Sequence, residues 1–367
     1  MEEMTNRALI FCYGLFIIVG LKELLFLEHR TSSHIVQLEE EKARFSIEAN
    51  IDPEVTDCRA VLKKFERQEI ESINRHAYHK LFQRSISRLT WTPKPFYVAT
   101  HHEKIDRVRA DIIEYGEYYE KELTKRVIEI YEEKVLQNEK SIFLDVGGNI
   151  GWFSLVAAKH GASKVYTFEP NVMNTIRFCE SLRLNDWLRD DPSKNFVYPI
   201  TKGAGEKDEA LQLMHTGQKK NPGSFSFQDT LGNGTEHTIS DETIQVTTLD
   251  SFAERHGWFQ HRPSIGLFKL DVELFELQVL RGARKLLSSG IVENIAMELK
   301  PKQTREDKEE ILKILFEANF ELYMHGKYKG PHLVVTKNYH SNWRDLLKDL
   351  DKSMYGENMM FRHRGNI

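Results

Sequence analysis

A glycine-rich stretch between two acidic residues is the first part of this chain whose residue types and spacing could bind a ligand. It reads Asp145-x-Gly147-x-Asn149-x-Gly151, and Glu169 follows 18 residues later. The stretch has neither the glycine spacing of a dinucleotide fingerprint nor the Gly-Lys-Ser/Thr of a P-loop. Asp145 disfavours a pyrophosphate and favours a positively charged ligand, such as a sulfonium carrying an α-amino group. Glu169 could accept hydrogen bonds from both ribose hydroxyls. The alternative is a tight turn beside a solvated acid.

A second group of acids follows further along the chain and could handle a proton. Asp271 and Glu273 are two residues apart at the end of one expected strand, and Glu298 ends the next. One of these carboxylates could take a proton from a hydroxyl or position it. Alternatively, Asp271 caps the next helix, Glu273 faces the helix dipole and Glu298 pairs with Lys300. Several carboxylates together could also hold Mg²⁺, which the sequence allows without requiring.

Short apolar runs alternate with amphipathic stretches from residue 141 onward, and they would position these acids. Strands are expected over 142–146, 164–168, 195–199, 267–271 and 294–298, and helices over 152–160, 174–184, 274–287 and 306–318. A hairpin is expected over 320–336, and a hairpin with ligand-side loops over 202–245. This alternation predicts an α/β fold with a parallel sheet covered on both faces. Ligands of such sheets lie at the carboxyl ends of the strands.

The N-terminal part of the chain has a different texture. Residues 8–27 form a stretch of 20 residues whose only charges are Lys22 and Glu23, long enough to cross a bilayer. We expect a signal anchor over 1–30, with a cleaved signal peptide or a buried helix as alternatives. A helical stem is expected over 31–95, the main domain over 96–340 and a C-terminal tail over 341–367.

The anchor predicts a single-pass membrane protein of the endomembrane system, in the Golgi or the endoplasmic reticulum. Lys and Arg are more frequent after the apolar stretch than before it, which favours a cytosolic domain. The sequon Asn233-Gly234-Thr235 favours a lumenal one. The side of the membrane therefore stays open at this point.

Charge and cysteine content narrow the choice of partners. The 367 residues carry 51 Lys and Arg against 55 Asp and Glu, so the basic excess of a nucleic-acid binder is absent. The three cysteines allow at most one disulfide. Because Cys12 falls in the expected anchor, Cys58 and Cys179 are the two that remain to pair.

The motifs, taken in order, resemble the FkbM family of S-adenosylmethionine-dependent methyltransferases. The resemblance is carried by residues 112–116, 143–155, 168–170, 246–252 and 268–276, followed by 279–283. The Thr-Leu-Asp block at 248–250 and the Lys-x-Asp-Val-Glu block at 269–273 make it specific. In one departure, Leu274 stands where the family usually has Gly, which bears on the substrate more than on the cofactor.

The resemblance implies a Rossmann-like, doubly wound and mostly parallel seven-stranded sheet that binds S-adenosylmethionine. The implied cofactor-binding residues are Asp145, Gly147, Gly148, Asn149, Gly151 and Glu169, and the implied catalytic candidates are Asp271, Glu273 and Glu298. The family's reaction is methyl transfer to a hydroxyl. The anchor and stem favour a sugar or glycan acceptor, with a lipid-like or polyketide-like molecule as the alternative. A silent cofactor-binding scaffold is the alternative outside the enzyme class.

Overall fold

The computed structural model describes part of the chain, all of it within one compact unit, Asp52–Ile367. The described residues are 54–73, 88–90, 92–101, 118–189, 195–215, 225–227, 238–300, 302–329, 332–336, 342–350 and 357–366. The expected anchor at 1–30 and the sequon lie outside them. Within these ranges, no helix combines the length and the apolar character that a membrane span requires.

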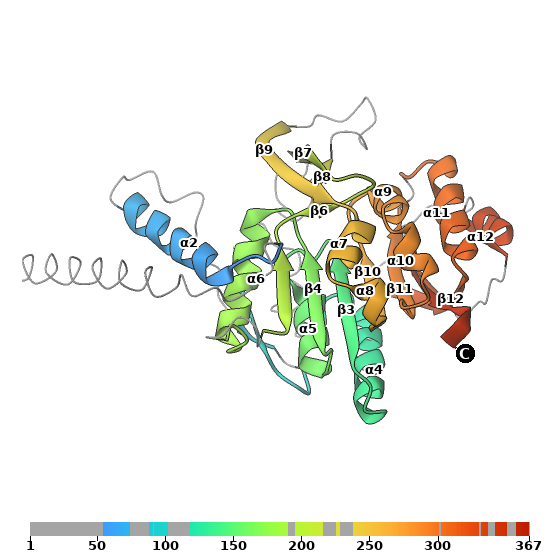
Figure 1. Ribbon diagram of the computed structural model, residues 1–367, viewed down its shortest axis with the longest axis horizontal. Coiled ribbons are helices and arrows are strands. Elements are labelled where there is room, and N and C mark those ends of the chain that lie inside the picture. The colour runs from blue at the N-terminus through green and yellow to red at the C-terminus, as the bar shows by residue number, and fades with distance from the viewer. Residues whose placement is uncertain are drawn as a thin grey trace, which may run out of the picture. The chain divides into compact units, whose positions relative to one another are not determined.

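A large mixed sheet forms the centre of the described unit (Figure 1). Its strands are β3 (Ser141–Val146), β4 (Lys164–Phe168), β5 (Val197–Ile200), β10 (Ser264–Leu270), β11 (Asn294–Leu299), β12 (Phe320–Lys329), β13 (His332–Thr336) and β14 (Glu357–His363). They lie in the order β13-β12-β14-β11-β10-β3-β4-β5. The five strands from β11 to β5 are mutually parallel, and β14 is antiparallel to both its neighbours. The predicted mostly parallel sheet is confirmed, with β13 as an eighth strand at its edge.

Helices cover both faces of this sheet, as the doubly wound prediction requires. One face carries α2 (Cys58–Ile73), α4 (Lys121–Leu136), α5 (Trp152–His160) and α6 (Val172–Leu184). The other carries α7 (Leu249–Arg255), α8 (Trp258–His261), α9 (Glu276–Arg281), α10 (Arg284–Ser288), α11 (Arg305–Glu317) and α12 (Trp343–Leu350). Strand β3 supplies both cores, because Leu144 and Val146 face one and Phe143 faces the other.

Local signals set the bounds of α5 and β4 at the residues predicted from the sequence. Gly151 precedes α5 with φ +85°, and Gly161 ends it with φ +111°. A left-handed residue after the last turn is a common way for a helix to stop. Strand β4 then begins at Lys164 and ends at Phe168, immediately before Glu169.

The helix predicted over 274–287 is wrong as a single element. The chain instead forms α9 and α10, separated at Gly282 and Ala283. A Cβ on Gly282 would lie 1.9 Å from the carbonyl oxygen of Gly205, so a distant loop occupies the space where a side chain would stand. The break therefore comes from tertiary packing, which the sequence pattern does not reveal.

Residues 341–367, which the sequence suggests are a tail, contribute α12 and the inner strand β14. This strand lies between β11 and β12 and buries Met359, Met360 and Phe361. A strand covered on both faces shows no alternation of polar and apolar residues, and this apolar run is only three residues long. The segment therefore lacks a recognisable strand pattern.

A smaller four-stranded sheet follows β5 and contains the predicted hairpin. It consists of β6 (Gly203–Ala204), β7 (Glu209–His215), β8 (Phe225–Phe227) and β9 (Thr238–Thr247), in the order β6-β9-β7-β8. Strands β7 and β9 pair in the antiparallel direction. A short ladder of β1 (Arg88–Leu89) and β2 (Tyr97–Val98) lies earlier in the chain.

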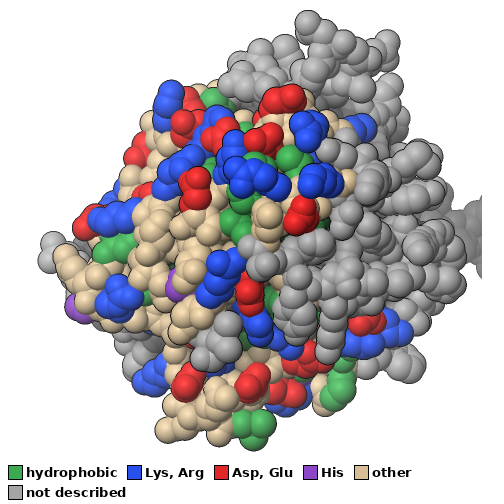
Figure 2. Space-filling view, turned by 90° about the vertical axis from the view of Figure 1, so that its right-hand side faces the viewer, with side chains coloured by type: hydrophobic (Ala, Val, Ile, Leu, Met, Phe, Trp, Pro, Cys, Tyr) green, Lys and Arg blue, Asp and Glu red, His purple; other side chains and the backbone are tan. Residues whose placement is uncertain are grey.

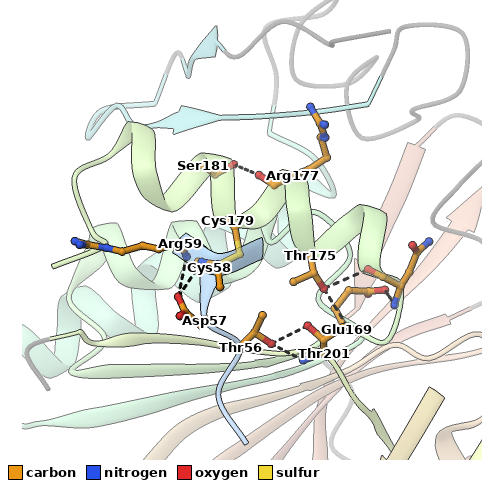
Figure 3. Close-up of a disulfide and its surroundings, with 12 residues drawn as sticks. Thr56, Asp57, Cys58, Arg59, Glu169, Thr175, Arg177, Cys179, Ser181 and Thr201 are labelled. Atoms are coloured by element: carbon orange, nitrogen blue, oxygen red, sulfur yellow. Dashed lines mark hydrogen bonds between the residues drawn. A yellow bond between two sulfur atoms is a disulfide. The ribbon is translucent and has the colours of Figure 1, made fainter. Parts of the chain in front are cut away.

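A disulfide between Cys58 and Cys179 joins α2 to α6, which confirms the predicted pairing (Figure 3). Both cysteines are buried. Just ahead of α2, the N–H of Thr56 donates to the carbonyl of Pro199 at 2.7 Å, and its hydroxyl lies 2.7 Å from that of Thr201. The beginning of α2 is therefore held against α6 and the end of β5.

Candidate active site

Asp145, near the carboxyl end of β3, is fully buried. Its Oδ2 accepts a hydrogen bond from the Ser154 hydroxyl on α5 at 2.7 Å. Its Oδ1 accepts no hydrogen bond from the described residues and lies 3.5 Å from Lys269 Nζ. Burial raises the pKa of Asp145, although Lys269 opposes the shift. An added donor or cation would satisfy this carboxylate.

The positions after β3 need glycine for two reasons. The turn has a backbone conformation that favours glycine, and neighbouring protein atoms leave no room for a Cβ. Gly147 has φ +84°, and a Cβ on it would lie 1.8 Å from the carbonyl oxygen of Asp271. A Cβ on Gly148 would clash with Thr167, and a Cβ on Gly151 would clash with the ring of Phe178. Gly147 thus brings the turn into contact with the end of β10, so the two predicted halves of the site touch.

Glu169, which follows β4, binds the turn and the start of α6 together. Its Oε2 accepts from the N–H of Asn149 at 2.8 Å, where Asn149 has φ +52°. Its Oε1 accepts from the N–H of Asn171 at 2.9 Å and from Asn174 Nδ2 at 3.2 Å. Burial raises the pKa of Glu169 to about 7. A carboxylate accepts about four hydrogen bonds, so these three donors leave capacity for a ligand hydroxyl.

Lys269 lies between Asp145, which precedes the glycine turn, and Asp271, which follows β10. It is paired across the sheet with Asp145, and its Nζ lies 3.2 Å from the Gly147 carbonyl oxygen and 3.7 Å from Asp271 Oδ2. Burial opposes its charge, but Asp145 and Asp271 raise the pKa of Lys269. The sequence analysis used Lys269 only as part of a motif and missed this linking position.

A pocket opens at the carboxyl ends of β10 and β11, next to the beginning of α4. Its polar lining consists of Glu120, Glu122, Lys269, Asp271, Glu298 and Asn358. Its apolar lining includes four methionines, Met297, Met324, Met359 and Met360. The lining therefore combines acidic groups with adaptable apolar surface.

The three predicted catalytic acids do not all lie in this pocket. Asp271 and Glu298 line it, whereas Glu273 forms an ion pair with Lys300. Lys300 also lies 3.5 Å from Glu298, as the alternative interpretation expected. Burial raises the pKa of Glu298, with Lys300 opposing the shift. Asp271 does not cap α9, because the residue before that helix is Phe275.

The loop between β10 and α9 explains the departure at Leu274. Glu273 has φ +54° and Leu274 has φ +78°, a region that glycine occupies without strain. The buried Glu276 holds this loop, since its Oε1 accepts from the N–H groups of Val272 and Leu274 at 3.2 and 3.4 Å. Gln303 Nε2 donates to its Oε2 at 2.7 Å. Burial raises the pKa of Glu276 to about 7.

Glu120, Glu122 and Glu276 are acidic residues of this region that were not among the sequence-based candidates. Glu120 precedes α4 with φ +41° and lines the pocket. Glu276 belongs to the last motif of the FkbM resemblance, so its position carried a signal. Glu120 lies in the turn that precedes α4 and had no comparable spacing to the other acids.

Within the described residues, no group of three His, Cys, Asp or Glu side chains is arranged to hold a metal ion. The acids of the pocket region are accompanied by Lys269 and Lys300 instead.

Residues 145–322 match the methyltransferase FkbM domain, and this chain therefore contains an FkbM methyltransferase domain. The matched segment begins at Asp145 and includes the glycine turn, Glu169 and the Asp271 loop. The resemblance seen in the sequence motifs is confirmed. No curated protein matches the chain.

Solved methyltransferase structures are similar to this chain at low identity. Methyltransferase FkbM from Methylobacillus flagellatus KT matches with 15% identity and a TM-score of 0.36, over 61% of this chain and 43% of that one. A SAM-dependent methyltransferase from Agrobacterium tumefaciens matches with 9% identity and a TM-score of 0.38, over 77% and 72% of the two chains. Precorrin-6y C5,15-methyltransferase from Geobacter metallireducens GS-15 matches with 9% identity and a TM-score of 0.32, over 72% and 91%. The chain thus spans less than half of the Methylobacillus structure.

Proposed function

We propose that this protein is an S-adenosylmethionine-dependent O-methyltransferase that acts on an uncharged hydroxyl, most specifically one of a sugar or glycan. The observation that supports this proposal is that the glycine turn contacts the end of β10, where Asp271 lines the pocket. A methyl donor on the turn and an acceptor in the pocket would therefore be neighbours.

The residues around the turn fit the proposed cofactor. Asp145 has an unsatisfied buried oxygen, and Glu169 retains capacity for a ribose hydroxyl. Burial raises the pKa of both acids, so a cationic ligand would offset the cost of their ionised forms. When bound, S-adenosylmethionine supplies the methyl group and a sulfonium leaving group.

Titration calorimetry with S-adenosylhomocysteine tests the cofactor assignment. The purified full chain should bind it, and Glu169→Gln should bind about 10- to 100-fold more weakly at a pH above 7, because a hydrogen bond to a charged acceptor is lost. Glu66→Gln is the matched control, since Glu66 is a half-exposed acid on α2 paired with Arg183. Absence of binding to the unmodified chain would refute the proposal. Unchanged affinity in Glu169→Gln would refute the ribose assignment alone.

The lining of the pocket supports an uncharged acceptor. Four acids face it against Lys269, so a phosphate or carboxylate on the acceptor would be repelled. The carboxylates can accept hydrogen bonds from hydroxyls, and the methionines can contact C–H surface. On the face drawn in Figure 2, Lys and Arg side chains are interspersed with Asp and Glu, which is unlike the basic surface of a nucleic-acid binder.

Two acceptors that differ in charge test this assignment. The full chain, methyl-labelled S-adenosylmethionine and octyl glucoside should give labelled glycoside, whereas the phosphate monoester of the same glycoside should accept far less. Glycan and lipid pools extend the assay to natural acceptors. Label only in the lipid pool would favour the lipid-like alternative. Binding of S-adenosylhomocysteine without transfer to any pool would favour a silent scaffold.

We also propose that this domain lies in an oxidising compartment, on the lumenal side of an endomembrane, behind the expected anchor. The buried Cys58–Cys179 disulfide supports this placement, because disulfides persist in oxidising compartments and are rare in the cytosol. This placement agrees with the sequon, which favours a lumenal domain. It disagrees with the Lys and Arg count, which favours a cytosolic one.

Two measurements on native membranes test this placement. Alkaline carbonate extraction should leave the protein in the pellet. Alkylation under denaturing conditions should label Cys58 and Cys179 only after reduction. Release into the supernatant would contradict the anchor, and labelling of both cysteines without a reductant would contradict the oxidising compartment.

A further inference from the structure

The beginning of α4 covers the pocket and is held there by contacts to its neighbours. Trp152 Nε1 donates to the Thr124 hydroxyl at 2.9 Å, and that hydroxyl donates to the carbonyl of Tyr119 at 2.5 Å. Trp152 is the first residue of α5, directly after the glycine turn. The turn that precedes α4 is therefore fixed to the segment that carries the proposed cofactor site.

Glu120 lies in this fixed turn and lines the pocket. It is partly buried, and its side chain does not cap α4. Lys269, Ala296 and Met360 are matched residues of β10, β11 and β14 on the sheet face that α4 covers. Glu298 is two residues further along β11 and therefore projects from the same face, and Asp271 is the first residue after β10 and lines the same pocket. Glu120 thus belongs to the wall opposite these two acids.

We propose that Glu120 is a catalytic residue of the acceptor pocket, which binds the acceptor hydroxyl opposite Asp271 and Glu298 and takes its proton. This inference rests on the proposed function. The acceptor oxygen forms a bond to the methyl carbon, the electron pair of the carbon–sulfur bond goes to sulfur, and the hydroxyl proton goes to the Glu120 carboxylate. Neither an oxidant nor another co-reactant is needed.

The charges around Glu120 suit this role. Desolvation, together with the neighbouring Asp271 and Glu298, raises the pKa of Glu120 to about 7, while Lys269 opposes the shift. From its own segment, Tyr119 donates a hydrogen bond to it. A base with a pKa near neutrality is ionised often enough to act and basic enough to accept a proton.

Glu120→Gln tests the proposal because it keeps the size of the side chain and removes the base. Methyl transfer to octyl glucoside should show a kcat about 100-fold lower or more, with affinity for S-adenosylhomocysteine within about twofold of the unmodified chain. The unmodified chain should show kcat rising through an apparent pKa near 7, and this rise should disappear in the variant. Glu120→Asp should restore part of the rate.

Glu129→Gln is the matched control, because Glu129 is an exposed acid on the same helix that pairs with Arg126. It should leave kcat and its pH profile unchanged. The proposal is overturned if Glu120→Gln keeps kcat within about threefold, or if it keeps the pH-dependent rise. If Glu120→Gln does not fold, Glu120→Ala decides, and an unchanged kcat in that variant overturns the role. Failure of the unmodified chain to bind S-adenosylhomocysteine or to methylate any acceptor would instead refute the proposed function.

Discussion

The two ends of the candidate site stabilise their carboxylates in different ways. At the cofactor end, Glu169 receives hydrogen bonds from Asn149, Asn171 and Asn174, all within 20 residues of it. At the acceptor end, Glu298 and Asp271 are accompanied by the charges of Lys300 and Lys269. Amide donors that are close in the sequence hold one end in place, and ion pairs with lysines hold the other.

This difference indicates which end is rigid before a ligand arrives. Backbone donors fix the orientation of Glu169, whereas a lysine can exchange one carboxylate for another as the charge around it changes. The acceptor end is therefore the more adaptable of the two. Three variants test this difference between the two ends of the site. They follow in order of decreasing expected effect.

Lys269→Met removes the cation that lies between the two ends of the site. Lys269 is buried between Asp145 and Asp271, so its removal leaves the buried Asp145 and the partly exposed Asp271 without this cation. We expect the free energy of unfolding in urea to fall by about 3–5 kcal/mol. Lys285→Met is the control, since Lys285 is exposed and paired with Glu254 on the surface; a loss of at most about 1 kcal/mol is expected there. Equal losses in the two variants would show that Lys269 does not join the ends.

Glu276→Gln tests the loop of the acceptor end through its pH dependence. The pKa of Glu276 is about 7 in the folded chain, above its ordinary value, so the folded state binds the proton more tightly than the unfolded state. Stability is therefore greatest below the ordinary value and falls as the pH rises through about 7. The contribution is on the order of 3 kcal/mol.

Urea unfolding across this pH range checks the expectation. Glu276→Gln should remove that part of the slope, while Glu306→Gln, at an exposed position in the first turn of α11, should keep it. A slope in Glu276→Gln that equals that of the unmodified chain would contradict the assignment.

Leu274→Gly and Leu274→Ala together isolate the smallest effect, the backbone strain at the acceptor end. Both remove the leucine side chain, but only Ala retains a Cβ at φ +78°. The Gly variant should be more stable than the Ala variant by about 1 kcal/mol. Thermal unfolding of the pair measures this difference, and an Ala variant as stable as the Gly variant would exclude strain at this position.

The cofactor end could be predicted from the sequence because its parts are close together in the chain. Residues 141–184 run from β3 through the turn, α5 and β4 to α6, and each step carries a local signal such as a glycine or an apolar run. The side chains of Asp145 and Glu169 then form hydrogen bonds with residues of this same stretch. The predicted ligand contacts of this end stay predictions.

The acceptor end could be predicted only in part. The sequence indicated Asp271 and Glu298 because both end strands, but it did not predict the ion pair of Glu273 with Lys300. Glu120 and Asn358 reach the pocket from segments before and after the matched domain. Sequence spacing gives no measure of such distances.

The sequence by itself determined the order of strands and helices, the glycine turn, the family and the two cysteines able to pair, because each depends on local residue types or on elimination among few residues. The tertiary structure decided the place of β14, the break between α9 and α10, the linking position of Lys269 and the wall formed by Glu120. These features depend on contacts between residues more than 50 positions apart, and the side chains that meet there carry no mark of their partners until the chain is folded.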